Sequence, residues 1–251
     1  MKVVVATHPR YFGPLKRTLD DLLRTGDAQD VIVVVADDAD GVHAWRVSQE
    51  YPGLAGVLPH GTNNYEYTSF AAVGEAVRDR NAWPEDSHFL MIHDTVVPGD
   101  EFWAKARALG EQVKHMGVGL WRPTMRDLMN GHTRGLRPVV VAKTWFPACN
   151  SFNIGMASRA LVLRCAAAYA RPITKPEGVR MEMDKYNPLS LAALSGPGGW
   201  DYLAGPSFSI KIVADEDVYN TGVIRRRMRL DMLDLDKVLV PCAACDHPDA
   251  A

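Results

Sequence analysis

Apolar residues along the chain alternate between short continuous runs and stretches with helical spacing. The continuous runs are rich in β-branched residues, and the clearest lie at Val3–Val5, Val31–Val35 and His88–Ile92. Consecutive apolar positions are typical of a strand buried on both faces of a parallel sheet. Apolar residues recurring every three or four positions predict helices over 14–25, 42–50, 67–80 and 100–114. This alternation predicts an α/β fold, a mostly parallel central sheet covered by helices on both faces.

The second half of the chain has a less regular pattern. Strands are expected near 117–121, 139–145 and 207–213, and a helix near 158–170, with Gly- and Pro-rich stretches between them. Neither a low-complexity linker nor an internal repeat divides the sequence. We therefore expect a single domain over 1–241, with halves 1–115 and 116–241, followed by a flexible tail over 242–251.

Composition excludes several function classes. The 251 residues carry 28 Lys and Arg against 30 Asp and Glu, a net charge of −2, so nucleic acid could be bound only through a local Arg patch. The longest apolar run, Val31–Ala36, is far shorter than the roughly 20 residues of a membrane span. The four cysteines show no disulfide framework spacing, and the start of the chain has no secretory pattern, which favours a cytoplasmic location.

Polar residues follow three of the predicted strands. Thr7 ends the first run, Asp37 and Asp38 end the second, and His93 and Asp94 end the third. Ligands of parallel α/β sheets bind outside the carboxyl ends of the strands. We therefore expect these side chains to converge on one site.

The segment Phe89–Pro98 is an apolar strand that ends in His93-Asp94-Thr95 and continues into Val-Val-Pro. With the turn after the first strand and the strand ending in Asp37-Asp38, it resembles the nucleotide-sugar glycosyltransferases of the GT-A fold. The resemblance implies a three-layer α/β/α sandwich, with residues 1–115 binding the nucleotide sugar and 116–241 binding the acceptor. It also implies transfer of a sugar from a nucleotide diphosphate donor to a hydroxyl of a glycan, protein or modified nucleobase. A UDP-sugar is the favoured donor.

The family's Asp-x-Asp motif holds Mn²⁺ or Mg²⁺ on the donor's diphosphate, and here His93 and Thr95 stand at its two acidic positions. The predicted metal ligands are therefore Asp94 and His93, because manganese accepts imidazole as well as carboxylate. Asp94 is also predicted to be a catalytic residue. In an alternative mechanism, arginines neutralise the diphosphate. The residues predicted to bind the diphosphate in this mechanism are Arg225 and Arg227, from a run of four arginines in five positions. Such a run is also typical of a solvated face.

The resemblance places the nucleoside near Thr7, Asp37 and Asp38, whose side chains would bond the base or the ribose. An Asp after a strand is also a common helix cap, so this alternative stays open. Asn64 and Tyr67 precede the third helix in a polar and aromatic segment, where they would contact ribose, diphosphate or sugar. A capping role in this segment, for Asn64 or its neighbour Thr68, is the competing interpretation.

On the acceptor side, a Gly-rich stretch leads into Trp200-Asp201-Tyr202. Asp201 is the predicted general base that takes the proton of the acceptor hydroxyl, with Glu182 and Asp184 as rivals. Acceptor contacts are expected from three side chains, Asn153, Trp200 and Tyr202. Because the Asp-x-Asp motif is altered, a catalytically altered GT-A-like module that binds a nucleotide or a glycan is the alternative function.

Overall fold

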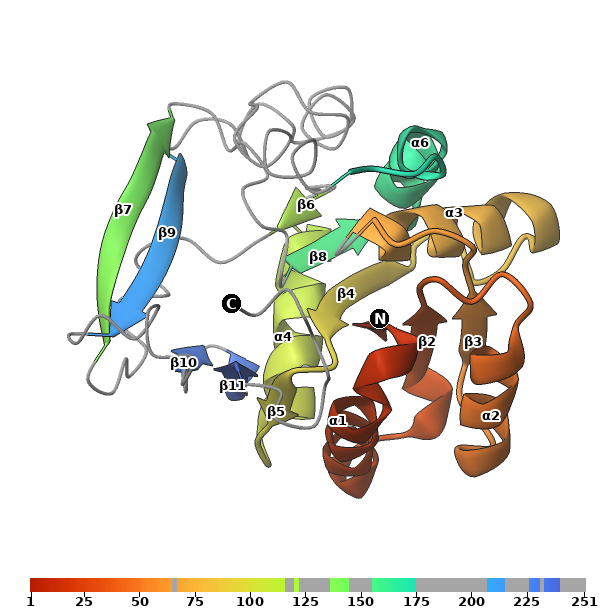
Figure 1. Ribbon diagram of the computed structural model, residues 1–251, viewed down its shortest axis with the longest axis horizontal. Coiled ribbons are helices and arrows are strands. Elements are labelled where there is room, and N and C mark those ends of the chain that lie inside the picture. The colour runs from red at the N-terminus through yellow and green to blue at the C-terminus, as the bar shows by residue number, and fades with distance from the viewer. Residues whose placement is uncertain are drawn as a thin grey trace.

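The structure is a computed structural model of the chain (Figure 1). It describes residues 1–64, 67–115, 120–121, 136–144, 155–174, 207–214, 226–230 and 233–239. In the part of the chain that it describes, no helix combines the length and the apolar character needed to cross a membrane.

A six-stranded sheet forms the centre of the molecule, in the order β3-β2-β1-β4-β8-β6. Its parallel strands are β1 (Lys2–Thr7), β2 (Val31–Val35), β3 (Gly56–Pro59) and β4 (His88–His93). Two antiparallel strands complete it, β8 (Gly155–Ser158) and β6 (Leu120–Trp121). The predicted mostly parallel sheet is confirmed, and the three apolar runs form its central strands.

Helices cover both faces of this sheet (Figure 1). They are α1 (Phe12–Thr25), α2 (Val42–Glu50), α3 (Thr68–Arg80), α4 (Phe102–His115) and α6 (Arg159–Tyr169). Alternate residues of a strand point to opposite faces. Accordingly Val3 and Val5 pack with α1, α2 and α4, while Val4 packs with α3 and α6. The predicted three-layer α/β/α arrangement is therefore confirmed.

Two smaller sheets accompany the central one. β7 (Leu136–Thr144) and β9 (Ser207–Ala214) form an antiparallel ribbon. Their residue ranges agree closely with the strands expected near 139–145 and 207–213. β10 (Arg226–Leu230), β11 (Leu235–Leu239) and β5 (Val96–Pro98) form a three-stranded antiparallel sheet. The sequence pattern did not predict β10, because an arginine-rich segment has no apolar period and its strand character comes from pairing with β11.

Gly26 directly follows α1. Its φ of −133° is extended, so the left-handed conformation of a glycine cap is not used. A Cβ at this position would overlap the indole of Trp103, whose Nε1 donates a hydrogen bond to the carbonyl of Leu22 over 2.9 Å. Gly26 therefore allows close packing of α4 on the end of α1.

Candidate functional site

The order of strands in the central sheet reverses next to β1. β1, β2 and β3 step outward in one direction, and β4 then returns to the other side of β1. Ligands of open α/β sheets bind outside the carboxyl ends of the strands at such a reversal. The register places Ala6 beside His93 and Thr7 beside Val35, so the polar residues after β1, β2 and β4 share this edge.

A hydrogen bond links the ends of β1 and β4 across this point. The hydroxyl of Thr7 donates to Oδ2 of Asp94 over 2.7 Å, and the backbone N–H of Asp94 donates to the carbonyl of Ala6 over 3.1 Å. Thr7 and Asp94 are 8% and 6% exposed. A carboxylate this deeply buried needs hydrogen-bond donors, and Thr7 fixes its orientation at the edge of the sheet.

Two residues of the segment after β1 also support Asp94, and the sequence pattern did not single them out. The hydroxyl of Thr18 in α1 lies 2.9 Å from the carbonyl of Asp94 and 2.8 Å from that of Val96, which holds the turn after β4. Burial raises the pKa of Tyr11, and the negative charge of Asp94 raises it further while Arg10 opposes this. The Tyr11 phenol therefore stays protonated and neutral beside Asp94.

His8 and Asp37 form a second polar pair, contributed by the segments that follow β1 and β2. The backbone N–H of Arg10 donates to Nδ1 of His8 over 3.2 Å, so Nδ1 is the acceptor and Nε2 carries the hydrogen of the neutral ring. Nε2 lies 3.0 Å from Oδ2 of Asp37, whose side chain is 48% exposed. Asp37 has a φ of 52°, a conformation that costs a non-glycine residue about 1–2 kcal/mol. Strained residues of this kind cluster at functional sites.

Asp38 has a different environment from its neighbour Asp37. It is 1% exposed, and both of its carboxylate oxygens accept backbone N–H groups at the start of α2, from His43 over 3.0 Å and from Ala44 over 2.7 Å. The helix-capping alternative is therefore the geometry observed for Asp38. A contact between Asp38 and a nucleoside stays a prediction. The nucleoside would have to share these two oxygens with the N–H groups of α2.

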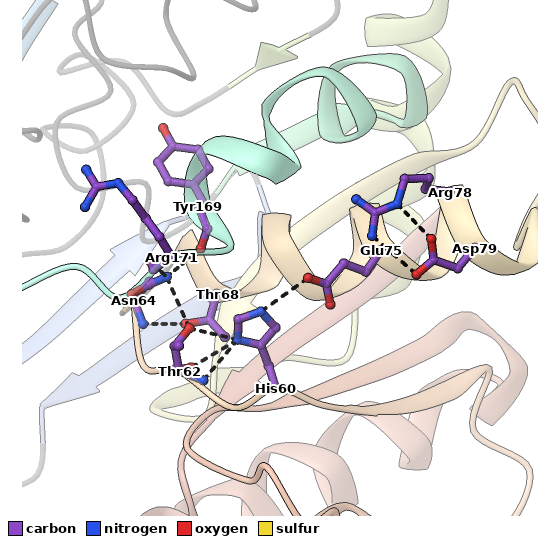
Figure 2. A network of polar contacts seen from close by, with 9 residues as sticks. All are labelled: His60, Thr62, Asn64, Thr68, Glu75, Arg78, Asp79, Tyr169 and Arg171. Atoms are coloured by element: carbon purple, nitrogen blue, oxygen red, sulfur yellow. Dashed lines mark hydrogen bonds and ion pairs between the residues drawn. The ribbon is translucent and has the colours of Figure 1, made fainter.

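Asn64 lies in a network of polar contacts that joins the loop after β3 to the end of α6 (Figure 2). Its Nδ2 donates to the carbonyls of Tyr169 over 2.5 Å and Arg171 over 2.8 Å, and its Oδ1 accepts the N–H of Ile173 over 2.8 Å. The backbone N–H of Asn64 donates to the hydroxyl of Thr68, the first residue of α3, over 2.8 Å. No described side chain caps the N–H groups at the start of α3, so the capping role expected for Asn64 or Thr68 is not observed. Asn64 is fully buried and bound to backbone groups, so the observed contacts give it a structural role.

Tyr67 is also taken into this network. It is 1% exposed, and its ring stacks on that of Tyr169 with a centroid distance of 4.6 Å and an interplanar angle of 12°. The ring face on this side therefore contacts α6. Stacking of Tyr67 on a ligand stays a prediction, and the opposite ring face would have to provide it.

The predicted metal ligands leave the sheet in different directions. Thr7 follows Val3 and Val5 on the α1 face, where it meets the Asp94 carboxylate, whereas His93 follows Phe89 and Met91 on the α3 face. Within the described residues, no group of three or more His, Cys, Asp or Glu side chains is arranged to hold a metal ion. The described donors therefore do not fit a divalent cation held by the protein alone, and Mn²⁺ or Mg²⁺ stays a prediction.

The remaining predicted site residues lie in the second half of the chain. Asn153, Trp200, Asp201, Tyr202 and Arg225 fall outside the described residues. Arg227 lies on β10, two strands away from β5 in the small antiparallel sheet. The structure thus brings together Thr7, Asp37, His93 and Asp94 at one sheet edge, with His8, Tyr11 and Thr18 beside them.

No protein-family model matches the chain, and no curated protein matches it. Solved structures show weak similarity. Staphylococcus aureus TarS 1–349 in complex with UDP is 13% identical with a TM-score of 0.44, and a second TarS 1–349 structure is 14% identical with a TM-score of 0.39. Both alignments cover 88% of this chain and 63% of TarS 1–349, so this chain spans less than two thirds of that protein. A 4-diphosphocytidyl-2C-methyl-D-erythritol synthase is 15% identical with a TM-score of 0.40, over 88% of this chain and 96% of that chain.

Proposed function

We propose that the chain binds a nucleoside diphosphate sugar at the carboxyl edge of β1, β2 and β4 and transfers the sugar to a hydroxyl acceptor. The observation that supports this most directly is the Thr7–Asp94 hydrogen bond across the reversal of strand order. It holds a carboxylate in place where α/β sheets bind their ligands. The UDP moiety is the donor part to test first, because the resemblance to GT-A enzymes carries this expectation.

The His8–Asp37 pair supplies the proposed nucleoside contact. The exposed part of the Asp37 carboxylate can accept a hydrogen bond from a uracil N–H or a ribose hydroxyl, while His8 holds the carboxylate from the other side. Hydrogen bonds to charged groups contribute about 1.5–3 kcal/mol each. Asp94 is proposed to accept a hydrogen bond from a hydroxyl of the ribose or of the transferred sugar, with Thr7 fixing the orientation of the carboxylate.

A transfer that inverts the configuration at the anomeric carbon requires a base on the acceptor side, whereas a retaining transfer would not need it. The acceptor oxygen attacks the anomeric carbon, the bond from that carbon to the diphosphate oxygen breaks, and UDP leaves with the electron pair. A carboxylate takes the acceptor proton, and Asp201 remains our first choice, with Glu182 and Asp184 as rivals. A divalent cation, Mn²⁺ before Mg²⁺, is a further prediction, and none of these steps is assigned to it.

A nucleotide- or glycan-binding module is the second candidate function. It is favoured by the replacement of both acidic positions of the Asp-x-Asp motif with His93 and Thr95. Such a module would bind UDP at the same edge and would not cleave a UDP-sugar.

Calorimetric titration with UDP, UMP and uridine, with and without Mn²⁺, tests the binding proposal. We expect UDP to bind and His8→Ala to weaken this binding by about tenfold, because the orienting partner of Asp37 is lost. Release of UDP from a panel of UDP-sugars then separates a transferase from a binding module. In the transferase, Asp201→Asn should lower turnover by roughly 10²–10⁴ and leave UDP affinity unchanged, with Glu182→Gln and Asp184→Asn as comparisons. A chain that binds neither of the two nucleotides nor uridine would contradict the proposal.

A further inference from the structure

A groove lies between α2 and the strand β3, at the outer edge of the central sheet (Figure 1). Its volume of about 310 Å³ is at the lower limit of small-molecule sites. α2 contributes Ala44, Trp45 and Ser48 to its walls, and β3 contributes Val57 and Pro59. Two regular elements of the sandwich therefore form a concave surface that the candidate site does not use.

Trp45 forms one wall of this groove and is largely open to solvent, with 65% of the residue exposed. Val42, one turn earlier on α2, is 56% exposed, and the two are among only three large apolar residues of the described chain that are exposed. A single exposed apolar residue needs no explanation, but an aromatic wall beside a concave surface is typical of a ligand site. The ring of Trp45 is therefore available to a ligand.

None of the described residues that line the groove is charged. Nucleic acids bind through lysine and arginine, so the lining does not suit a polyanion. The Ser48 hydroxyl donates to the carbonyl of Trp45 over 2.7 Å, and its oxygen keeps the capacity to accept a hydrogen bond. The Tyr51 hydroxyl lies 2.9 Å from Asp20 of α1 and is engaged there. These side chains favour a neutral ligand that donates hydrogen bonds.

The backbone of β3 adds further acceptors. The N–H of His60 donates to the carbonyl of Val35, so the even-numbered residues of β3 face β2. Val57 and Pro59 therefore face outward, where the described sheet has no further strand. Proline has no N–H, so this edge presents two carbonyls and a single donor. A partner strand needs alternating donors and acceptors, whereas ligand hydroxyls can donate to both carbonyls.

The exposed apolar surface at the groove is too small for a stable contact with a second copy of the chain. A standard interface buries about 800 Å² on each partner. Even complete burial of a tryptophan covers at most about 250 Å². Charged residues also surround the patch on both sides of Trp45, namely Asp40, Arg46 and Glu50. Size and charge therefore favour a small neutral ligand.

We propose that the α2–β3 groove binds a neutral oligosaccharide, with one sugar ring stacked on Trp45. A sugar ring has an apolar face of C–H groups, which packs on the negative face of an aromatic ring. It also carries hydroxyl groups along its rim, which would donate hydrogen bonds to the Ser48 oxygen and to the outward carbonyls of Val57 and Pro59. This site is separate from the Asp94 edge, so it goes beyond the proposed function and does not depend on it.

Calorimetric titration with cellotetraose, maltotetraose and N-acetylchitotetraose tests the site, with tetragalacturonate as the anionic comparison. We expect one or more of the neutral tetrasaccharides to bind and tetragalacturonate not to bind. Trp45→Ala should weaken this binding by at least about tenfold and melt like the parent chain, because the side chain is exposed. Trp45→Phe should retain part of the affinity. Val42→Ala is the matched control, exposed on the same helix and outside the groove, and should bind like the parent.

Three outcomes would overturn the proposal. They are a parent chain that binds none of the neutral tetrasaccharides, an equal loss of binding in Trp45→Ala and Val42→Ala, and a dimer of the parent in analytical ultracentrifugation that Trp45→Ala dissociates. If Trp45→Ala does not fold, Trp45→Gln removes the ring and keeps a long side chain, and binding that it retains would count against the stacking.

Titration with UDP keeps this proposal apart from the proposed function. Because the groove is separate from the Asp94 edge, Trp45→Ala should leave UDP affinity unchanged, and saturating UDP should leave tetrasaccharide affinity unchanged. A chain that binds UDP and no tetrasaccharide contradicts the groove assignment alone. A chain that binds a tetrasaccharide at Trp45 and no UDP contradicts the proposed function alone.

Discussion

Two groups of polar side chains follow the strands of the same sheet edge and have opposite surroundings. In the site group, Thr7, His8, Asp37 and Asp94, the side chains bond to one another across β1, β2 and β4. In the backbone-bound group, Asp38 and Asn64, the side chains bond to N–H and C=O groups of other segments. The two groups have similar residue types and similar positions after strands.

The difference lies in what each contact stabilises. Asp38 and Asn64 satisfy buried backbone groups that would otherwise lack partners, so their contacts hold α2 and the end of α6 in place. The contacts of the site group orient side chains at the edge where a ligand would bind, and they satisfy few backbone groups. Substitutions in the two groups should therefore separate into effects on ligand handling and effects on stability.

Asp94→Asn should show the largest effect on function. Asparagine keeps the size of the side chain and an oxygen that accepts a hydrogen bond from the Thr7 hydroxyl, and it removes the negative charge. We expect sugar transfer, measured as UDP release from a UDP-sugar, to fall by at least about 100-fold, with stability within about 1 kcal/mol of the parent. Asp86→Asn, an exposed residue before the other end of β4, is the matched control and should retain activity.

Asp94→Ala is a less informative variant than Asp94→Asn. The structure shows Asp94 6% exposed and bonded to Thr7, so alanine would leave a buried hydroxyl without this acceptor, at a cost of about 1–3 kcal/mol. Full activity in a folded Asp94→Asn protein would show that the site lies elsewhere.

The predictability of each feature follows from the sequence distance of its contacts. The apolar runs of β1, β2 and β4 and the period of α2 are local patterns, and they predicted the central sheet and its layers. The capping role of Asp38 involves N–H groups five and six residues away, so it could be weighed as an alternative from the sequence. The partners of Asn64 lie 105 to 109 residues away, where no local pattern indicates them.

Asn64→Ala should show the largest effect on stability. It removes hydrogen bonds to the backbone of Tyr169, Arg171 and Ile173, and leaves these groups in a buried region without their partner. We expect the free energy of unfolding to fall by about 2–4 kcal/mol in urea titrations. The UDP affinity of the folded fraction should stay unchanged. The exposed Gln49→Ala is the control and should lie within about 0.5 kcal/mol of the parent.

Asn64→Asp tests whether the amide donor of Asn64 is required at this position. The carboxylate keeps an acceptor for the N–H of Ile173 and directs a second oxygen toward the carbonyls of Tyr169 and Arg171. It should be about as destabilising as alanine, because two acceptors then face each other. If Asn64→Ala weakened UDP binding and left stability unchanged, Asn64 would belong to the site group.

Asp38→Ala should have a smaller effect on stability. It removes the acceptor for the N–H groups of His43 and Ala44 at the start of α2. Loss of such a cap costs about 1–2 kcal/mol, measurable by urea denaturation, and we expect UDP affinity to change by less than about twofold. A large loss of UDP binding at unchanged stability would instead support the nucleoside contact predicted for this residue.

Asp37 provides the smallest and most selective test, because its carboxylate and its backbone conformation can be changed separately. Asp37→Ala and Asp37→Gly both remove the partner of His8, so both should weaken UDP binding by about tenfold. The φ of 52° is strained for alanine and allowed for glycine, so Asp37→Gly should be more stable than Asp37→Ala by about 1 kcal/mol. If the carboxylate binds the nucleoside, calorimetry should give the two variants equal UDP affinities while urea denaturation separates their stabilities. If glycine restored UDP binding and alanine did not, the conformation of the turn rather than the carboxylate would determine binding, and Asp37 would no longer belong to the site group.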